Sequence, residues 1–204
     1  MYVYNKLKGK FMKTRSDITK KMLVEALETL LRDKPLNKIS IQELVDQCGL
    51  NRQTFYYHFE DIFNLVEYSF EKGFMLSLYT YKGQALWQEG LKELLIELES
   101  NRIVYKHVLC DMSRDQLFNL FYKYISNLVV NAIDDIAKGQ SIDLKYKENI
   151  TLYFSISFGS IIEQWIFGRI NQSVDELVDF LDTLIQDQIA GAVERLRKNS
   201  TNDR

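Results

Sequence analysis

The chain has 204 residues, of which 46% are hydrophobic and 26% are charged. This balance is typical of a globular protein with one domain, or with a small domain joined to a larger one. One proline and nine glycines are few for the turns of sandwiches, barrels and doubly wound sheets, so the composition favours an all-α fold. No apolar stretch reaches the ~18 residues of a membrane span, and the polar, basic residues 1–10 are not typical of a signal peptide.

Charge is distributed unevenly along the chain. The formal net charge is −2, but residues 1–60 carry +4 and the remainder −6. This asymmetry predicts that only the N-terminal part binds a polyanion, although a chance imbalance on a solvated surface would look the same. Two cysteines, Cys48 and Cys110, are too few for a disulfide framework or a zinc site, so we expect a cytoplasmic protein without a metal or cofactor.

The first third of the chain predicts four helices in close succession. Apolar residues at helical spacing indicate a helix over residues 16–34, which Pro35 ends. Ser40 and Glu43 form the S-x-x-E pattern of a capping box, which starts a short helix over residues 41–48. Gly49 is suited to the left-handed residue that ends this helix, and Asn51 to the cap of the next, over residues 52–58. Residue 61, an aspartate, is expected to cap a long helix that reaches residue 78 or beyond.

The rest of the chain also shows helical periodicity and no strand-like alternation. We expect helices over residues 87–99, 103–112, 115–137 and 145–170, with a polar break over 139–143. A second capping box, Ser173 and Glu176, starts the last helix. The expected architecture is therefore all-α with about nine helices. Its predicted parts are a basic extension (1–12), a helix-turn-helix (13–60) and a helical regulatory and dimerisation domain (61–204).

The two short helices and their glycine turn have the layout of a helix-turn-helix. Leu44, Val45, Leu50 and Phe55 are the apolar positions expected to lock them together. The second helix opens with an arginine, a glutamine and a threonine, residue types that read base edges in the major groove. Its tyrosines and histidine are better suited to phosphates. In the alternative interpretation its aromatic residues belong to an ordinary helical hairpin, which does not account for the polar opening.

Residues 39–59, ISIQELVDQCGLNRQTFYYHF, closely resemble the DNA-binding signature of the TetR family of transcriptional regulators. The resemblance extends over about residues 18–65, and it implies a homodimer of all-helical subunits that binds a palindromic operator. The form NRQTFYYHF, followed by an Asp-Ile pair, together with a distal WIFG sequence, is similar to the DhaS-like subgroup of dihydroxyacetone kinase regulators. Family members usually carry a phosphate-binding lysine three residues beyond Phe59, where this chain has Ile62. Backbone amides or nearby basic side chains are expected to bind that phosphate instead. The predicted DNA-binding residues are Lys13, Arg15, Lys38, Ser40, Asn51, Arg52, Gln53, Thr54, Tyr56, Tyr57 and His58.

The C-terminal part offers two groups of candidate residues. The last two helices are expected to form the dimer interface, which the resemblance implies, although an internal core would bury the same stripe. The predicted interface residues are Ser155, Gly159, Ile162, Ile166, Leu181, Ile185 and Ile189. A ligand pocket is expected among the preceding helices, where aromatic residues are also ordinary core. The candidates for this pocket are Trp87, Tyr105, His107, Cys110, Phe118, Tyr122, Tyr153 and Trp165.

Two other functions compete with DNA-binding regulation. An enzyme is disfavoured, because the chain has two histidines and none of the common catalytic, phosphate-binding or metal-binding motifs. A helical protein-interaction module, or a regulator that answers to a protein coactivator, stays open. The sequence therefore predicts a DNA-binding regulator whose partners are an operator duplex, a second copy of itself, and an unidentified small-molecule or protein effector. Residues 1–11 are either an additional basic arm or the result of an upstream start codon.

Overall fold

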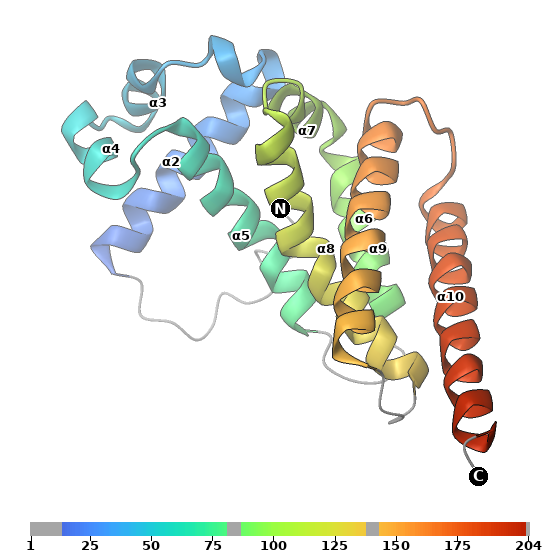
Figure 1. Cartoon of the computed structure of the whole chain (residues 1–204). Coiled ribbons are helices and arrows are strands. Elements are labelled where there is room, and N and C mark those ends of the chain that lie inside the picture. The colour runs from blue at the N-terminus through green and yellow to red at the C-terminus, as the bar shows by residue number, and fades with distance from the viewer. Residues whose placement is uncertain (1–13, 81–86, 138–142, 203–204) are drawn as a thin grey trace. The chain divides into compact units, whose positions relative to one another are not determined.

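The computed structural model describes residues 14–80, 87–137 and 143–202 (Figure 1). Within these ranges it contains nine α-helices, one short 3₁₀ turn and no strand, which confirms the all-α prediction. Contacts divide the chain into two compact units. Unit 1 comprises Met1–Ser77 and Ser100–Ser113, and unit 2 comprises Leu78–Glu99 and Arg114–Arg204.

Unit 1 is built around the long helix α2 (Arg15–Asp33), against which α3 (Ile41–Cys48), α4 (Arg52–His58) and α7 (Arg102–Leu109) pack (Figure 1). A 3₁₀ turn, η1 (Leu36–Lys38), leads from α2 into α3, and α5 (Ile62–Thr80) follows α4. Apolar side chains from α2 to α5 and from the 3₁₀ turn are almost fully removed from solvent, and this burial stabilises the small unit. The most deeply buried of them are Leu23, Leu27, Leu31, Leu36, Leu44, Val45, Phe55 and Leu65.

Local sequence signals set the bounds of the short helices. The Ser40 hydroxyl accepts a hydrogen bond from the Glu43 amide (3.2 Å), and the Glu43 carboxylate accepts one from the Ser40 amide (2.9 Å). Gly49 has a φ of +65°, a conformation that residues with a Cβ atom rarely adopt. The Asn51 side chain caps α4 by accepting from the Thr54 amide at 2.8 Å. The predicted capping box, glycine turn and bounds of both helices are therefore confirmed.

Helix α7 belongs to unit 1 although it lies far along the chain from α2. Nδ1 of His107 lies 2.7 Å from the carbonyl oxygen of Leu31, so this nitrogen carries the proton and donates. At the end of the same segment, the Asp111 carboxylate accepts from the backbone amide of Asn37 at 2.9 Å and from its side-chain amide at 2.6 Å. The contacts thus group residues 100–113 with the helix-turn-helix, whereas the sequence assigned them to the C-terminal domain.

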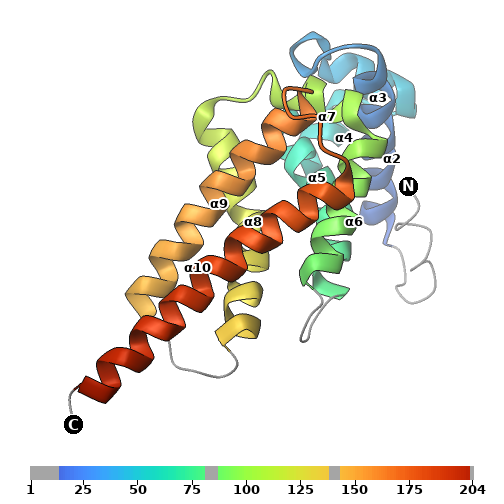
Figure 2. The same cartoon turned by 90° about the vertical axis from the view of Figure 1, so that its right-hand side faces the viewer.

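Unit 2 contains α6 (Trp87–Ser100), α8 (Arg114–Ala137), α9 (Leu144–Ile166) and α10 (Val174–Asn202). Helix α8 packs along α9 and also contacts α10, and α10 runs beside α9 in both views (Figures 1 and 2). The capping box predicted for the start of α10 is confirmed, because Ser173 and Glu176 exchange hydrogen bonds. Asp143 accepts from the amide of Tyr146 at the start of α9.

Helix α9 ends four residues earlier than the sequence indicated. The prediction of a helix to residue 170 was wrong, because Gly168 has a φ of +75° and reverses the chain. The amide of Gly168 donates to the carbonyl of Trp165, and that of Arg169 to the carbonyl of Gln164. These bonds satisfy carbonyl groups that the helix leaves open. The preceding apolar run hid this signal at the sequence level. Helix α7 is similarly shorter than predicted, since it ends at Leu109.

Candidate nucleic-acid interface

Helix α4 is fixed to unit 1 by one buried aromatic side chain and presents the others to solvent. Phe55 is 0% exposed, and its ring lies 5.6 Å from that of Tyr56 and 5.9 Å from that of Phe59, centroid to centroid. Arg52 and Gln53 are exposed at the start of the helix. Tyr57 is 83% exposed, which is unusual for a large aromatic residue and typical of a binding surface. Hence the prediction that Phe55 is a core residue is confirmed.

Three of the predicted contact residues already use their side chains within the motif. Asn51 accepts hydrogen bonds from the Thr54 amide and, at 3.0 Å, from the Thr54 hydroxyl. The Ser40 hydroxyl both accepts from the Glu43 amide and donates to its carboxylate. These side chains therefore fix the starts of α3 and α4, which orients the exposed groups that follow them.

A lysine–carboxylate pair strengthens the capping box of α3. Lys34 forms an ion pair with the Glu43 carboxylate. The hydrogen bond from Lys34, together with those from the Ser40 amide and hydroxyl, lowers the pKa of Glu43 from 4.5 to about 2. The carboxylate therefore stays ionised under all ordinary conditions and completes the cap.

Basic side chains flank α4 on neighbouring elements. Arg15 begins α2, and Lys38 ends the 3₁₀ turn before α3; both are exposed. Lys20 lies closer, with its ammonium 5.7 Å from the ring centroid of Phe59. Partial burial, together with the positive charge of Lys20, lowers the pKa of His58 below its ordinary value of 6.5. Lys13 and the expected extension over residues 1–12 lie outside the described residues.

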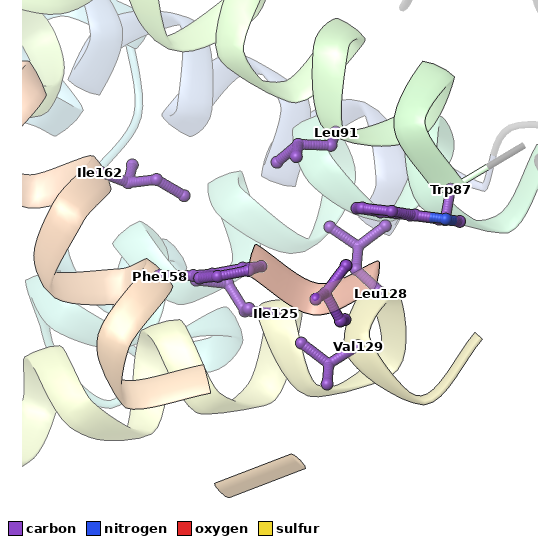
Figure 3. A pocket seen from close by; sticks show the side chains of 8 residues that line it. Trp87, Leu91, Ile125, Leu128, Val129, Phe158 and Ile162 are labelled. Atoms are coloured by element: carbon purple, nitrogen blue, oxygen red, sulfur yellow. The ribbon is translucent and has the colours of Figure 1, made fainter. Parts of the chain in front are cut away.

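Unit 2 contains a small apolar cavity (Figure 3). The volume of this cavity that the centre of a water molecule could occupy is about 10 Å³, roughly the room that one water needs. Side chains from four helices surround it, and all but one of them carry only carbon atoms. The lining residues are Trp87 and Leu91 of α6, Ile125, Leu128 and Val129 of α8, Phe158 and Ile162 of α9, and Ile185 of α10.

Of the aromatic and polar residues proposed for a pocket, only Trp87 lines this cavity. Three others lie in unit 1: the ring of Tyr105 contacts that of Phe70, His107 bonds to α2, and Cys110 is exposed. The remaining candidates lie elsewhere in unit 2. Tyr153 is 60% exposed, Phe118 and Tyr122 stack on each other on the surface, and the buried indole of Trp165 donates to the carbonyl of Gln172. In the sequence, the aliphatic residues that line the cavity cannot be distinguished from ordinary core residues.

The residues proposed for the dimer interface are buried within a single chain. Six of them are 0–1% exposed. The seventh, Gly159, is so close to α8 that a Cβ atom would lie 2.8 Å from the Cβ of Phe121. These seven residues are Ser155, Gly159, Ile162, Ile166, Leu181, Ile185 and Ile189.

A different set of apolar side chains on the same two helices faces solvent. These are spaced one helical turn apart on α9 and on α10, so that each helix carries an exposed apolar face. We call them the outer face of α9 and α10. It comprises Leu152, Tyr153 and Ile156 of α9 and Phe180 and Leu184 of α10, with exposed fractions between 37% and 60%. The sequence analysis missed it because these positions lie beside the more regular buried stripe.

Among the helices that the structure describes, none combines the length and apolar character needed to cross a membrane. The described residues contain no group of three or more His, Cys, Asp or Glu side chains placed to hold a metal ion.

A helix-turn-helix whose second helix exposes polar groups, followed by a helical body, is typical of DNA-binding transcriptional regulators. Comparisons with known proteins identify the family within this class. Residues 23–68 match the family described as bacterial regulatory proteins, tetR family, and residues 86–187 match the transcriptional regulator C-terminal region. The chain therefore belongs to the TetR family, whose members are regulators and not enzymes.

Individual relatives agree with this assignment. The chain is 26% identical over 117 residues to the HTH-type dhaKLM operon transcriptional activator DhaS of Lactococcus lactis, an alignment that spans 57% of this chain and 63% of that protein. The solved structure of a dihydroxyacetone kinase operon activator DhaS is 25% identical, with a TM-score of 0.67 over 85% of this chain and 97% of that one. A TetR transcriptional regulator from Streptococcus agalactiae shares the fold at 20% identity, with a TM-score of 0.61, 84% coverage of this chain and 95% of that one.

Proposed function

We propose that the chain binds an inverted-repeat DNA operator as a homodimer through α4, and that an effector which binds unit 2 controls this affinity. The proposal rests mainly on the contrast between buried and exposed side chains within α4. Phe55 is fully buried, while Arg52, Gln53, Tyr56 and Tyr57 are exposed. A helix held by one anchor and projecting polar groups from its start is suited to the major groove.

The exposed side chains have the chemistry for both kinds of DNA contact. Arginine pairs with O6 and N7 of guanine, and glutamine with N6 and N7 of adenine. The hydroxyl groups of Tyr56 and Tyr57 and the flanking cations Arg15 and Lys38 are suited to phosphates, which fix the register without reading sequence. Asn51, Thr54 and Ser40 contribute by holding the starts of the two helices.

A homodimer follows from the outer face of α9 and α10. Five large apolar side chains exposed on neighbouring helices would be costly to leave in water. In a two-fold dimer the same face of each subunit covers the other, and the subunits place two recognition helices on one side of the duplex. The support for a dimer therefore comes from exposed residues, which differ from the buried residues predicted from the sequence.

Effector control is proposed from the connection between the units. Helix α5 begins beside α4 in unit 1 and continues into unit 2, and α7 is joined along the chain to α6 and α8 of unit 2. A molecule that binds one arrangement of unit 2 more tightly than another would change the population of DNA-binding dimers. At about 10 Å³ the cavity has room for about one water, so a small-molecule effector would have to widen it, and the lining favours an apolar compound because it offers almost no polar groups. The DhaS relatives are described as operon activators, and activation with a protein effector is the second candidate.

The proposal is tested by selecting bound DNA from a pool of random duplexes with the purified full chain. We expect enrichment of one inverted repeat, and an Arg52→Ala variant should lose part of that preference. Enrichment of no inverted repeat would contradict the proposal. A variant lacking residues 1–60 distinguishes the alternative, since a protein-interaction module would keep its partner whereas a regulator would lose its DNA.

A further inference from the structure

One lysine beside the recognition helix is held in an unusual way. Lys20 lies in the second turn of α2 and is partly exposed. Its ammonium nitrogen lies 5.0 Å from the ring centroid of Tyr68 and 5.7 Å from that of Phe59. The two rings themselves are 5.4 Å apart in an edge-on arrangement. Two aromatic faces therefore hold the cation through their electron density.

The positive charge of Lys20 is not neutralised within the described part of the chain. Its neighbour Lys21 lies 3.0 Å from the Glu25 carboxylate, and Lys34 is paired with Glu43. No carboxylate lies within ion-pairing distance of Lys20 among the described residues. Rings position an ammonium but leave its three donors available, so Lys20 is an oriented cation without an anion.

The cation lies at the end of α4. Phe59 is the residue that ends α4, and its amide donates to the carbonyl of Phe55. The charge of Lys20 also contributes to the lowered pKa of His58, the last residue of the helix. Because Arg52, Gln53, Tyr56 and Tyr57 of α4 are exposed, a duplex that receives the start of this helix would bring the adjoining sugar–phosphate backbone towards its flanks.

We propose that Lys20 is a phosphate-binding residue, held ready by Phe59 and Tyr68 to neutralise one backbone phosphate of a DNA duplex bound at α4. The inference rests on the proposed DNA-binding function. Since the two rings already restrict the side chain, little rotamer entropy remains to be lost when the phosphate binds. A phosphate contact adds affinity for any sequence, so Lys20 contributes to register and to non-specific binding rather than to base preference.

The test uses a fluorescent mixed-sequence 30-base-pair duplex and the full-length protein. Anisotropy titrations at several KCl concentrations give the slope of log K against log [salt], which is about −0.9 for each phosphate neutralised. Three variants are compared with the wild type. Lys20→Met keeps an apolar chain over the rings, Lys20→Arg keeps the charge, and Lys21→Met is the matched control because its charge is already paired. Thermal unfolding followed by circular dichroism confirms that each variant is folded.

We expect Lys20→Met to make the slope less negative by about 0.9 per bound subunit, whereas Lys20→Arg and Lys21→Met keep the wild-type slope. If the wild type shows a salt-dependent affinity and Lys20→Met leaves its slope unchanged, the inference is wrong while DNA binding stands. An equal change of slope in Lys21→Met would also overturn the inference, because the effect would then come from the overall positive potential near α2 and not from a specific phosphate contact. A wild-type protein without affinity for any duplex would instead contradict the proposed function itself.

Discussion

Gly159 of α9 lies directly against Phe121 of α8: a Cβ atom at position 159 would be 2.8 Å from Cβ and 2.9 Å from Cγ of the phenylalanine. These atoms are the inner part of a side chain on a packed helix and cannot move without the backbone. The two helices therefore approach closely at this point only because residue 159 has no side chain.

Replacement of this glycine should destabilise the isolated subunit. We expect Gly159→Ala to lower the free energy of unfolding by about 1–3 kcal/mol, the usual cost of an added methyl group in a packed core. Urea unfolding followed by circular dichroism measures this, with the exposed neighbour Ser160→Ala as the control. Equal stability of the two variants would show that the contact between α8 and α9 leaves room for a methyl group at residue 159.

Dimerisation should depend on the outer face instead. Ile156 is 47% exposed on α9, so we expect Ile156→Arg to leave the fold intact and to convert dimers into monomers, because a charge would be buried in the interface. Sedimentation velocity measures the change. Ile96→Arg is the control, since Ile96 is 46% exposed on α6. A dimeric Ile156→Arg protein would contradict this interface.

The capping box of α3 should give the stability of unit 1 a defined acid dependence. The pKa of Glu43 is about 2 in the folded chain against an ordinary value of 4.5. The depressed value means that its contribution is complete above about pH 4.5 and is lost as the pH falls towards 2. The stability difference between wild type and Glu43→Gln should therefore shrink over this interval in urea unfolding experiments.

Glu176 provides the comparison for this experiment. Its pKa is also lowered by hydrogen bonds from the Ser173 amide and hydroxyl, but no lysine bond contributes to the shift. Glu176→Gln should consequently show a smaller acid-dependent difference than Glu43→Gln. A difference for Glu43→Gln that stays constant from pH 7 to pH 2.5 would argue against the ion pair with Lys34.

Substitution of a base-contacting residue and of a phosphate-contacting residue should have different effects on DNA affinity. Arg52→Ala should reduce discrimination at one base position by about 1–3 kcal/mol, because a bidentate contact to guanine would be lost. Arg15→Ala should weaken binding to all duplexes alike. Competition between the selected operator and its single-base variants measures both effects. Uniform weakening by Arg52→Ala would place this side chain on the backbone and not on a base.

The sequence predicted the helix-turn-helix almost residue by residue because its signals are local. Ser40, Gly49 and Asn51 each act on amides or dihedral angles within a few residues. A sequence motif and its structural effect therefore coincide there, and helices α3 and α4 have the predicted bounds.

The sequence was ambiguous where contacts between distant segments determine the environment of a residue. Gly159 and Ser155 suggested a close contact between helices, but whether the partner was α8 or a second chain could not be read from one helix. The aromatic candidates for a pocket had the same ambiguity: His107 bonds to Leu31, which is 76 residues away. Aliphatic residues such as Leu91 and Val129 line the cavity only because four helices meet around it.

In the proposed complex, two copies of α4, held apart by one dimer, read opposite halves of a symmetric duplex. Inserting five base pairs between the halves of the selected operator turns one half-site to the opposite side of the DNA. Recognition helices in such dimers are held about 34–36 Å apart, so the affinity should fall to that of a mixed-sequence duplex. Undiminished affinity for the lengthened operator would contradict simultaneous reading of both half-sites by one dimer.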